Sequence, residues 1–169
     1  MDPSQQLRQM RLEFYEEDID EINSILSEFL DASQAKCVLV VDREGHLVTK
    51  KGFTRSFDTT SLSALVAASF ASTKAMAEVL GETQFLVLSH QGTNEHIHIA
   101  LASGRALLVI VFDDRTTLGM VRLYASEVTN RVSEALEKAE ERNKSRAPQR
   151  LKADFEEAAE QRLADFFGE

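Results

Sequence analysis

Three histidines lie in or beside two predicted strands, and their type and spacing come nearest to metal chemistry. His96 and His98 have the two-residue spacing that places side chains on one face of a strand, and His90 lies on the preceding strand. A zinc site would also need carboxylate or thiolate ligands, which the neighbouring sequence does not obviously supply. The alternative is that the histidines are polar side chains on the outer face of a strand. We therefore expect no metal ion and no other cofactor.

Other reactive residue types have simpler explanations. Asp113 and Asp114 lie where a predicted strand turns into a helix, and helix capping accounts for them without catalysis. Arg55 stands in a short loop after Gly52, where it reaches a phosphate or is merely solvated. Cys37 is followed by the apolar run VLVV, which favours a buried, unreactive thiol. No nucleophile with a neighbouring base can be named.

The sequence also lacks the common catalytic and nucleotide-binding motifs. It contains no GxxxxGK[ST] phosphate-binding loop, and GxGxxG, GxSxG and HExxH are absent. We therefore predict that the protein has no active site of its own and is not an enzyme.

Composition narrows the class of partner. The chain has 169 residues, of which 43% are hydrophobic, and a net charge of −9. So acidic a chain has no general attraction for nucleic acid or an anionic membrane surface, and we expect neither partner. There is no apolar run long enough to span a membrane, no apolar signal core near the N-terminus, and only one cysteine. We expect a cytoplasmic protein without disulfides.

Periodicity and turn residues predict the elements that must position any site. Apolar residues at three-to-four spacing predict a first helix over 12–30, and 36–52 has the pattern of a β-hairpin. A helix over 62–80 begins after Asp58 or Thr59 and ends at Gly81. Further strands are predicted at 85–90, 95–102 and 106–113, followed by a long helix capped by Thr116 or Thr117. Two groups of neighbouring strands between helices predict an α+β fold with one antiparallel sheet.

The end of the chain differs in composition from the rest. Residues 142–152 are basic, contain Pro148 and lack an apolar pattern, so we interpret them as a linker. Residues 153–169 are acidic with two phenylalanines near the end, and we predict a tail helix there. The proposed division is therefore a domain over 1–141, a basic linker over 142–152 and an acidic tail helix over 153–169. The alternative for the tail is a disordered acidic end, because so short a helix is marginal without a surface to pack on.

The helix over 62–80 has two unlike faces. Helical projection places larger apolar side chains on one side, which we expect to pack on the sheet: Leu62, Leu65, Val66, Phe70, Met76, Val79 and Leu80. The opposite side carries Ala64, Ala68, Ala71 and Ala75. One explanation is that alanine is the best helix former and tolerates exposure. The other is that small side chains let another protein approach closely, with a second copy of the chain using part of the face.

Two sequence blocks resemble the Roadblock family of dynein-light-chain-like proteins, and within it the bacterial MglB group. They are FDTTSLSALVAASFASTKAMAEVLGE at 57–82 and LVIVFDDRTTLGMVRL at 108–123. The resemblance covers about residues 14–140, and the FFGE ending at 166–169 matches the acidic terminal helix of that group. It implies an α-β-β-α-β-β-β-α order with a five-stranded antiparallel sheet and a tail helix. The basic 142–152 segment and the bulky Phe70 depart from the family pattern.

The resemblance also implies a function. Members of that group are homodimers that act on MglA, a small Ras-like GTPase, as GTPase-activating proteins in bacterial cell polarity and motility. They reposition the GTPase's own catalytic residues, and their terminal helix favours nucleotide exchange or the GTP-bound state. A role in polarity would place the protein at a cell pole. A Roadblock scaffold without activating function, and a small-molecule sensor domain, are the alternative interpretations.

Carried over to this sequence, the resemblance names two sets of contact residues. The interface for the GTPase and the second copy comprises Asp20, Ala64, Ala68, Ala71 and Ala75, with Ala71 and Ala75 the strongest candidates for direct GTPase contact. In the tail the residues expected to contact the GTPase form one apolar stripe: Leu151, Phe155, Ala159, Leu163 and Phe166.

Overall fold

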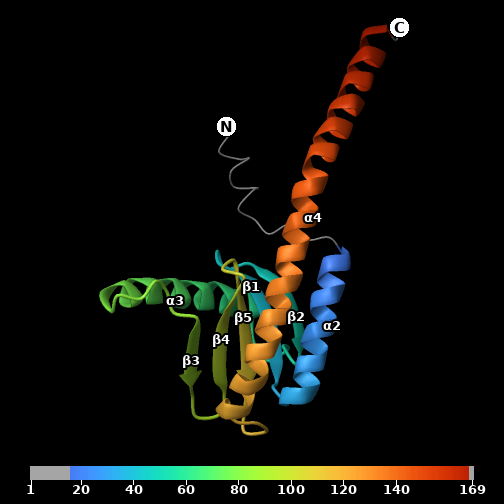
Figure 1. Cartoon of the computed structure of the whole chain (residues 1–169). Coiled ribbons are helices and arrows are strands. Elements are labelled where there is room, and N and C mark those ends of the chain that lie inside the picture. The colour runs from blue at the N-terminus through green and yellow to red at the C-terminus, as the bar shows by residue number, and fades with distance from the viewer. Residues whose placement is uncertain (1–15, 168–169) are drawn as a thin grey trace.

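The backbone is described for residues 16–167 of a computed structural model, with side chains over 16–146 and 158–162. Residues 1–15 and 168–169 lie outside the described part. The elements in chain order are α2 Glu16–Ser33, β1 Cys37–Asp42, β2 Leu47–Gly52, α3 Thr59–Val79, β3 Val87–Gln91, β4 His96–Ala102, β5 Ala106–Phe112 and α4 Leu118–Phe167 (Figure 1). This order confirms the predicted fold. The predicted start of the first helix, residues 12–15, falls outside the described residues.

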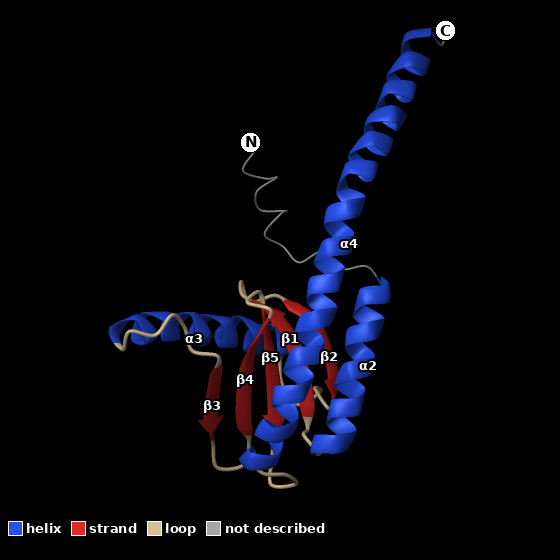
Figure 2. Cartoon of the chain, viewed as in Figure 1, coloured by secondary structure: helices blue, strands red, loops and turns tan. Residues whose placement is uncertain are grey.

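The five strands form one antiparallel sheet in the order β2-β1-β5-β4-β3 (Figure 2). Helices α2 and α4 lie side by side on one face, and α3 lies on the other. Both faces are therefore covered over the middle strands, and every residue of β1 and β5 is buried. This double coverage is the reason that the two strands are continuous apolar runs rather than alternating ones.

Alternate residues of the middle strands pack into two separate hydrophobic cores, one on each face of the sheet. Val38 and Val40 of β1 face α2 and α4, where they pack with Leu26 and Val132. Leu39 and Val41 point the opposite way and pack, with other side chains, under Phe70 of α3. The period of two along a strand thus lets one strand serve both layers.

Both ends of α3 are terminated as predicted. The Asp58 carboxylate caps the first turn by accepting hydrogen bonds from the Thr60 and Ser61 backbone N–H groups, at 3.0 and 3.3 Å. At the other end Gly81 has φ +78, which glycine adopts without strain. The Glu82 N–H then donates to the Ala77 carbonyl at 2.9 Å and the Gly81 N–H to the Glu78 carbonyl at 3.1 Å, which is a Schellman motif.

The predicted burial of α3 is correct for only part of the helix. Val66 and Phe70 are buried and Leu62 is partly buried, as expected. Four other side chains assigned to the core side are exposed, so that prediction was wrong: Leu65 at 68%, Met76 at 53%, Val79 at 86% and Leu80 at 71%. For the last three the physical reason is that the second half of α3 extends past the sheet, so no strand lies beneath it (Figure 1). Leu65 lies in the first half of the helix, where it is exposed beside Ala64 and Ala68.

Helix α4 begins after Thr117, whose hydroxyl accepts a hydrogen bond from the Met120 N–H at 3.3 Å, as a helix cap does. It then continues without a break to Phe167, 50 residues in all. The segment 142–152 is therefore helical and does not separate the tail from the preceding helix. Its role as a linker stays a prediction. Lysine, arginine, alanine and glutamine are strong helix formers, and they prolong a helix already nucleated by packing. Pro148 opposes the helix, because it removes a backbone N–H and its ring crowds the carbonyl four residues earlier, yet the helical backbone continues through it. A separate role for the tail remains a prediction.

No described helix is both long and apolar enough to cross a membrane.

Candidate protein-binding surfaces

The four alanines predicted to form a contact surface are all exposed on α3. We call Ala64, Ala68, Ala71 and Ala75 the alanine strip. Its first residue lies against the β1–β2 turn, because a Cβ atom on Gly45 would come within 3.0 Å of the Ala64 Cα. The strip is therefore bounded by that turn at Ala64 and continues along the exposed side of the helix to Ala75.

A second exposed surface lies where α3 ends and β3 begins. Five large apolar side chains are exposed near this point, and we call them the α3–β3 patch: Met76 at 53% exposure, Val79 at 86%, Leu80 at 71%, Leu86 at 62% and Val87 at 43%. The first three lie at the end of α3, whereas Val87 pairs with Ala100 and faces the α4 side of the sheet. Large apolar side chains exposed near one edge of a protein are candidates for a contact with another protein. The sequence prediction missed this surface, since it assigned the α3 members to the protein's own core.

The two edges of the sheet are not equally protected against pairing. Strand β2, at one edge, carries Lys50 and Lys51 and pairs with β1 through a register shift between Val40 and Val41. Lysines and such irregularities are the usual protection of an edge strand. Strand β3, at the other edge, has the sequence VLSHQ, with no Lys, Arg, Asp, Glu or Pro, and five-residue in-register pairing to β4. The β3 edge is thus the one open to a further strand.

The other predicted contact residues lie apart from the strip. Asp20 is exposed on α2, on the opposite face of the sheet from α3, so one chain does not bring it together with the alanines. Ala159 is partly exposed on the extension of α4. The side chains of Leu151, Phe155, Leu163 and Phe166 lie outside the described residues.

The histidines of β4 face the helical layer rather than solvent. His98 is 2% exposed, and its Nδ1 lies 2.8 Å from the Ser89 hydroxyl on β3. Burial, together with the Arg122 guanidinium, lowers the pKa of His98 below its usual value. The His96 ring packs on Phe112 with centroids 5.1 Å apart. The interpretation as outer-face polar residues was wrong for His98, because α4 covers that part of the strand, whereas His96 is partly exposed. His90 is exposed on β3.

Within the described residues, one group has metal-compatible geometry. Ligand atoms of Asp42, Glu44 and His46, in the β1–β2 turn, all lie within 4.8 Å of one another. The Asp42 carboxylate already accepts hydrogen bonds from the Glu44 and His46 backbone N–H groups, at 2.9 and 2.8 Å. This carboxylate therefore has a turn-forming role that accounts for its position.

Of two further reactive groups, Cys37 behaves as predicted, whereas Asp113 closes a turn before Thr117 and does not cap α4. Cys37 is fully buried, and burial raises the pKa of its thiol to about 11, so little reactive thiolate exists near neutral pH. The Asp113 carboxylate accepts hydrogen bonds from the Arg115 backbone N–H and side-chain Nε–H, at 3.1 and 2.9 Å. The pKa of Asp113 is lowered by these bonds. Burial accounts for Cys37 and turn formation accounts for Asp113, without a catalytic role for either.

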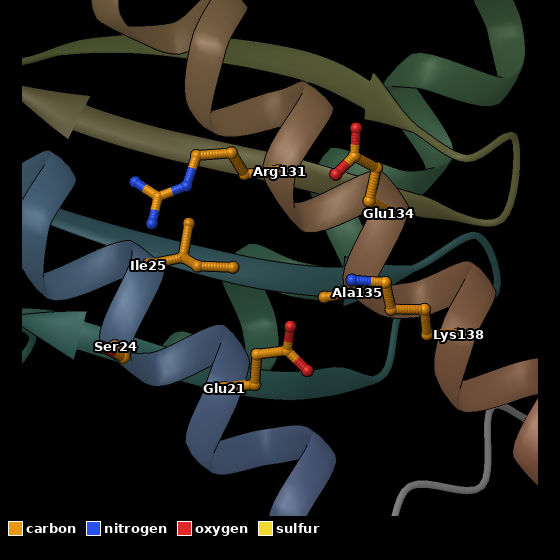
Figure 3. Close-up of a pocket in the computed structure, with 7 residues that line it drawn as sticks. All are labelled: Glu21, Ser24, Ile25, Arg131, Glu134, Ala135 and Lys138. Atoms are coloured by element: carbon orange, nitrogen blue, oxygen red, sulfur yellow. The ribbon is translucent and has the colours of Figure 1, made fainter.

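A pocket of about 330 Å³ lies between α2 and α4 (Figure 3). Its lining mixes charged and apolar side chains: Glu21, Ser24, Ile25, Arg131, Glu134, Ala135 and Lys138. The Arg131 guanidinium already donates to the Glu28 carboxylate at 2.7 Å. A ligand site normally offers a mostly apolar enclosure with a few convergent polar groups, and this open, charge-rimmed groove does not. It gives the small-molecule sensor interpretation no support.

Comparison with known families decides the class of the chain. The Roadblock/LC7 domain model matches residues 21–112, more than half of the sequence. The chain belongs to the Roadblock/LC7 family. The match begins in α2 and ends with β5, so it contains the whole sheet, α3 and the alanine strip.

Solved structures place this Roadblock chain near MglB proteins. It is 30% identical to the gliding protein MglB of Thermus thermophilus, covering 76% of this chain and 97% of that one, with a TM-score of 0.71. It is 33% identical to Myxococcus xanthus MglB over 76% and 96% of the two chains, with a TM-score of 0.70. A third MglB, described as having a tetrameric arrangement, is 30% identical with a TM-score of 0.73 and coverage of 76% and 96%. Among curated proteins none matches at a significant level.

Proposed function

We propose that this Roadblock protein is a homodimeric regulator of a small Ras-like GTPase of the MglA type and acts as its GTPase-activating protein. Support comes from the similarity to two named MglB proteins at 30% and 33% identity over three quarters of the chain. The observation that carries the proposal is the exposed alanine strip on α3, at the residues that the family resemblance names.

The alanine strip suits activation without a catalytic residue. Small side chains allow a backbone segment of the GTPase to lie flush against α3. By binding better to a GTPase conformation whose own arginine and glutamine are in place, the regulator raises the population of that conformation. Each tenfold shift in population requires only about 1.4 kcal/mol of preferential contact. Of the strip, Ala71 and Ala75 are the proposed direct contacts, since Ala64 is bounded by the β1–β2 turn.

The homodimer uses the α3–β3 patch and the open edge of β3. Pairing two β3 strands would satisfy the free backbone groups of that edge. It would cover Val87 on the α4 face of the sheet, and the side chains near the end of α3 would meet the second copy on the other face. Two α3 helices then lie beside one another, so their alanine strips form one platform. In this arrangement the α3–β3 patch forms the dimer interface and the alanine strip binds the GTPase.

The extension of α4 supplies a second contact, which favours nucleotide exchange or the GTP-bound state. A helix reaching away from the platform could contact the GTPase at a different surface, through the tail residues named above. Asp20 on α2 remains a further proposed contact. The process is bacterial cell polarity and motility, with the protein in the cytoplasm and at a cell pole.

GTP turnover by an MglA-like GTPase, with and without this protein, tests the proposal. We expect acceleration by the native protein and its loss in the Ala71→Arg/Ala75→Arg variant, because two guanidinium groups prevent close approach. The variant should keep its fold, since both sites are exposed. Glu137→Arg, exposed on α4 across the sheet, makes the same change of net charge and should leave the acceleration intact. Stable binding without acceleration would instead make the protein a scaffold.

A further inference from the structure

An ion pair joins the first turn of α2 to α4 at the point where α4 extends beyond α2 and the sheet. Asp18 is only 2% exposed, and its carboxylate lies 2.5 Å from a terminal nitrogen of Arg142 on α4. The same Arg142 nitrogen is 3.8 Å from the carboxylate of Glu21. One arginine of α4 thus meets two acidic residues in successive turns of α2.

Arg142 stands just beyond the packed part of α4. Ala139, at 1% exposure, is the last buried residue of the helix among the described side chains. Past this point α4 leaves α2 and the sheet behind (Figure 1). The 25 residues after Arg142 extend about 37 Å at the rise of an α-helix. Tilting the helix by about 10° at Arg142 would move its far end by about 6 Å. The contact made by Arg142 therefore has a large effect on the position of the tail.

Asp18 is suited to fix that direction. It lies in the first turn of α2, where the helix dipole favours a negative charge. A buried carboxylate is stabilised by a cation in good geometry, and the Arg142 guanidinium in contact with Asp18 is such a cation. An exposed ion pair, by contrast, tolerates many side-chain arrangements and contributes little. Because its carboxylate is buried while Arg142 is partly exposed, this pair constrains geometry more than a fully solvated pair at the same place would.

Other ion pairs of α4 lack this burial. Arg131 pairs with Glu28 of α2 at 2.7 Å, with side chains 40% and 59% exposed, and it lies within the packed part of the helix. Arg105, in the β4–β5 turn, pairs with Glu140 at 2.8 Å with 41% and 30% exposure. The Glu28–Arg131 pair joins the same two helices and so provides a matched control.

We propose that Asp18 and Arg142 form a clasp that sets the direction of the α4 extension and so positions the tail for the GTPase. The second half of this statement rests on the proposed function. Asp18 and Arg142 are positioning residues, since they act through the placement of the tail. Breaking the clasp should alter exchange, which depends on the tail, but not hydrolysis, which depends on the alanine strip.

Electron–electron distance measurements test the clasp without any GTPase. Spin labels at Ser27→Cys on α2 and Glu160→Cys on α4, both exposed sites, report the direction of the extension in a Cys37→Ala background. An excess of unlabelled protein suppresses distances between copies. We expect a narrow distribution in the native protein, a broad or shifted one in Asp18→Asn, and no change in Glu28→Gln. Equal distributions in the native protein and Asp18→Asn, or an equal change in Glu28→Gln, would overturn the clasp.

Nucleotide kinetics test the consequence. With an MglA-like GTPase, Asp18→Asn should slow stimulated nucleotide exchange several-fold, while stimulated GTP hydrolysis stays at the native level and Glu28→Gln changes neither. An altered distance distribution with unchanged exchange would overturn the link from clasp to tail function. If native protein stimulates neither reaction, the proposed function fails, and the distance measurement still decides whether the clasp exists. Circular dichroism and thermal melting establish that each variant is folded.

Discussion

His98 is a buried histidine whose protonation opposes folding. It lies at 2% exposure beneath α4, bonded to Ser89 and facing Arg122. Because burial and Arg122 lower its pKa in the folded chain, the neutral imidazole is the form that fits this environment. His96, two residues away, packs on Phe112 instead. The two side chains therefore serve packing between the sheet and α4.

This pKa shift predicts a loss of stability in mild acid. The unfolded chain binds a proton at His98 as the pH falls through about 6.5, while the folded chain resists doing so. The free energy of unfolding should therefore decrease below that pH. Thermal melting from pH 7.5 to 5.5 should show a smaller decrease in His98→Gln than in the native protein. His90→Gln, at an exposed site on β3, should keep the native decrease. Equal pH profiles for all three proteins would contradict this account.

At the scale of the element, α3 and β3 together present a surface that the rest of the chain does not cover. The helix extends beyond the sheet, and the neighbouring strand has an unprotected edge. Fully burying one large apolar side chain stabilises a contact by about 1.5–3 kcal/mol. Several such side chains in the α3–β3 patch would offset a large part of the entropic cost of association, and pairing of the β3 edges would add to their effect.

We predict that lysines in this patch dissociate the dimer. Val79→Lys with Val87→Lys puts two charges where the proposed contact is apolar, and should weaken dimerisation by at least about tenfold, or about 1.4 kcal/mol. Light scattering after gel filtration should give twice 18.9 kDa for the native protein and approach 18.9 kDa for the variant on dilution.

The control for this prediction is an exposed leucine outside the patch. Leu123, on α4, is 65% exposed, and Leu123→Lys should leave the mass unchanged. A variant with Val79→Lys and Val87→Lys that stays dimeric at every concentration would show that the copies associate through another surface.

At the scale of the whole molecule, one helix connects the folded body to the proposed tail contact. Packing against α2 and the sheet ends at Ala139, and α4 continues to Phe167. A rigid helical connection transmits direction, which a flexible linker does not. The two proposed activities therefore lie on different parts of the molecule, with hydrolysis at α3 and exchange at the extension.

Removing the extension should separate these two activities. A protein ending at Ala147 keeps every buried residue of the described part and the whole α3–β3 patch. We expect it to remain dimeric and to stimulate hydrolysis within about twofold of the native protein, a difference of about 0.4 kcal/mol, while losing its effect on exchange. Stopped-flow nucleotide release and steady-state GTP turnover measure the two effects. Loss of the dimer on truncation would contradict our account of the tail.

Much of the fold followed from local sequence patterns. Local signals predicted the hairpin, the five strands in their order along the chain, the caps at Asp58 and Thr117, and the ending at Gly81. These features depend on the spacing and turn chemistry of neighbouring residues, which the sequence shows directly. Helical projection also predicted the exposure of the alanine strip, although it wrongly placed four large side chains of α3 in the core. The resemblance to the family supplied the expected partner.

Other features required the tertiary structure. Val79 and Leu80 are apolar by sequence but exposed, and His98 is polar but buried, because burial depends on which element lies opposite a side chain. The helical path through residues 142–152 was missed because tertiary packing of the preceding turns nucleates a helix that local composition left undecided. The sequence by itself thus determined the order of the elements along the chain and the small-residue face of α3. Only the tertiary structure decided which faces remain uncovered and that Asp18 meets Arg142, since both depend on contacts between residues far apart in the chain.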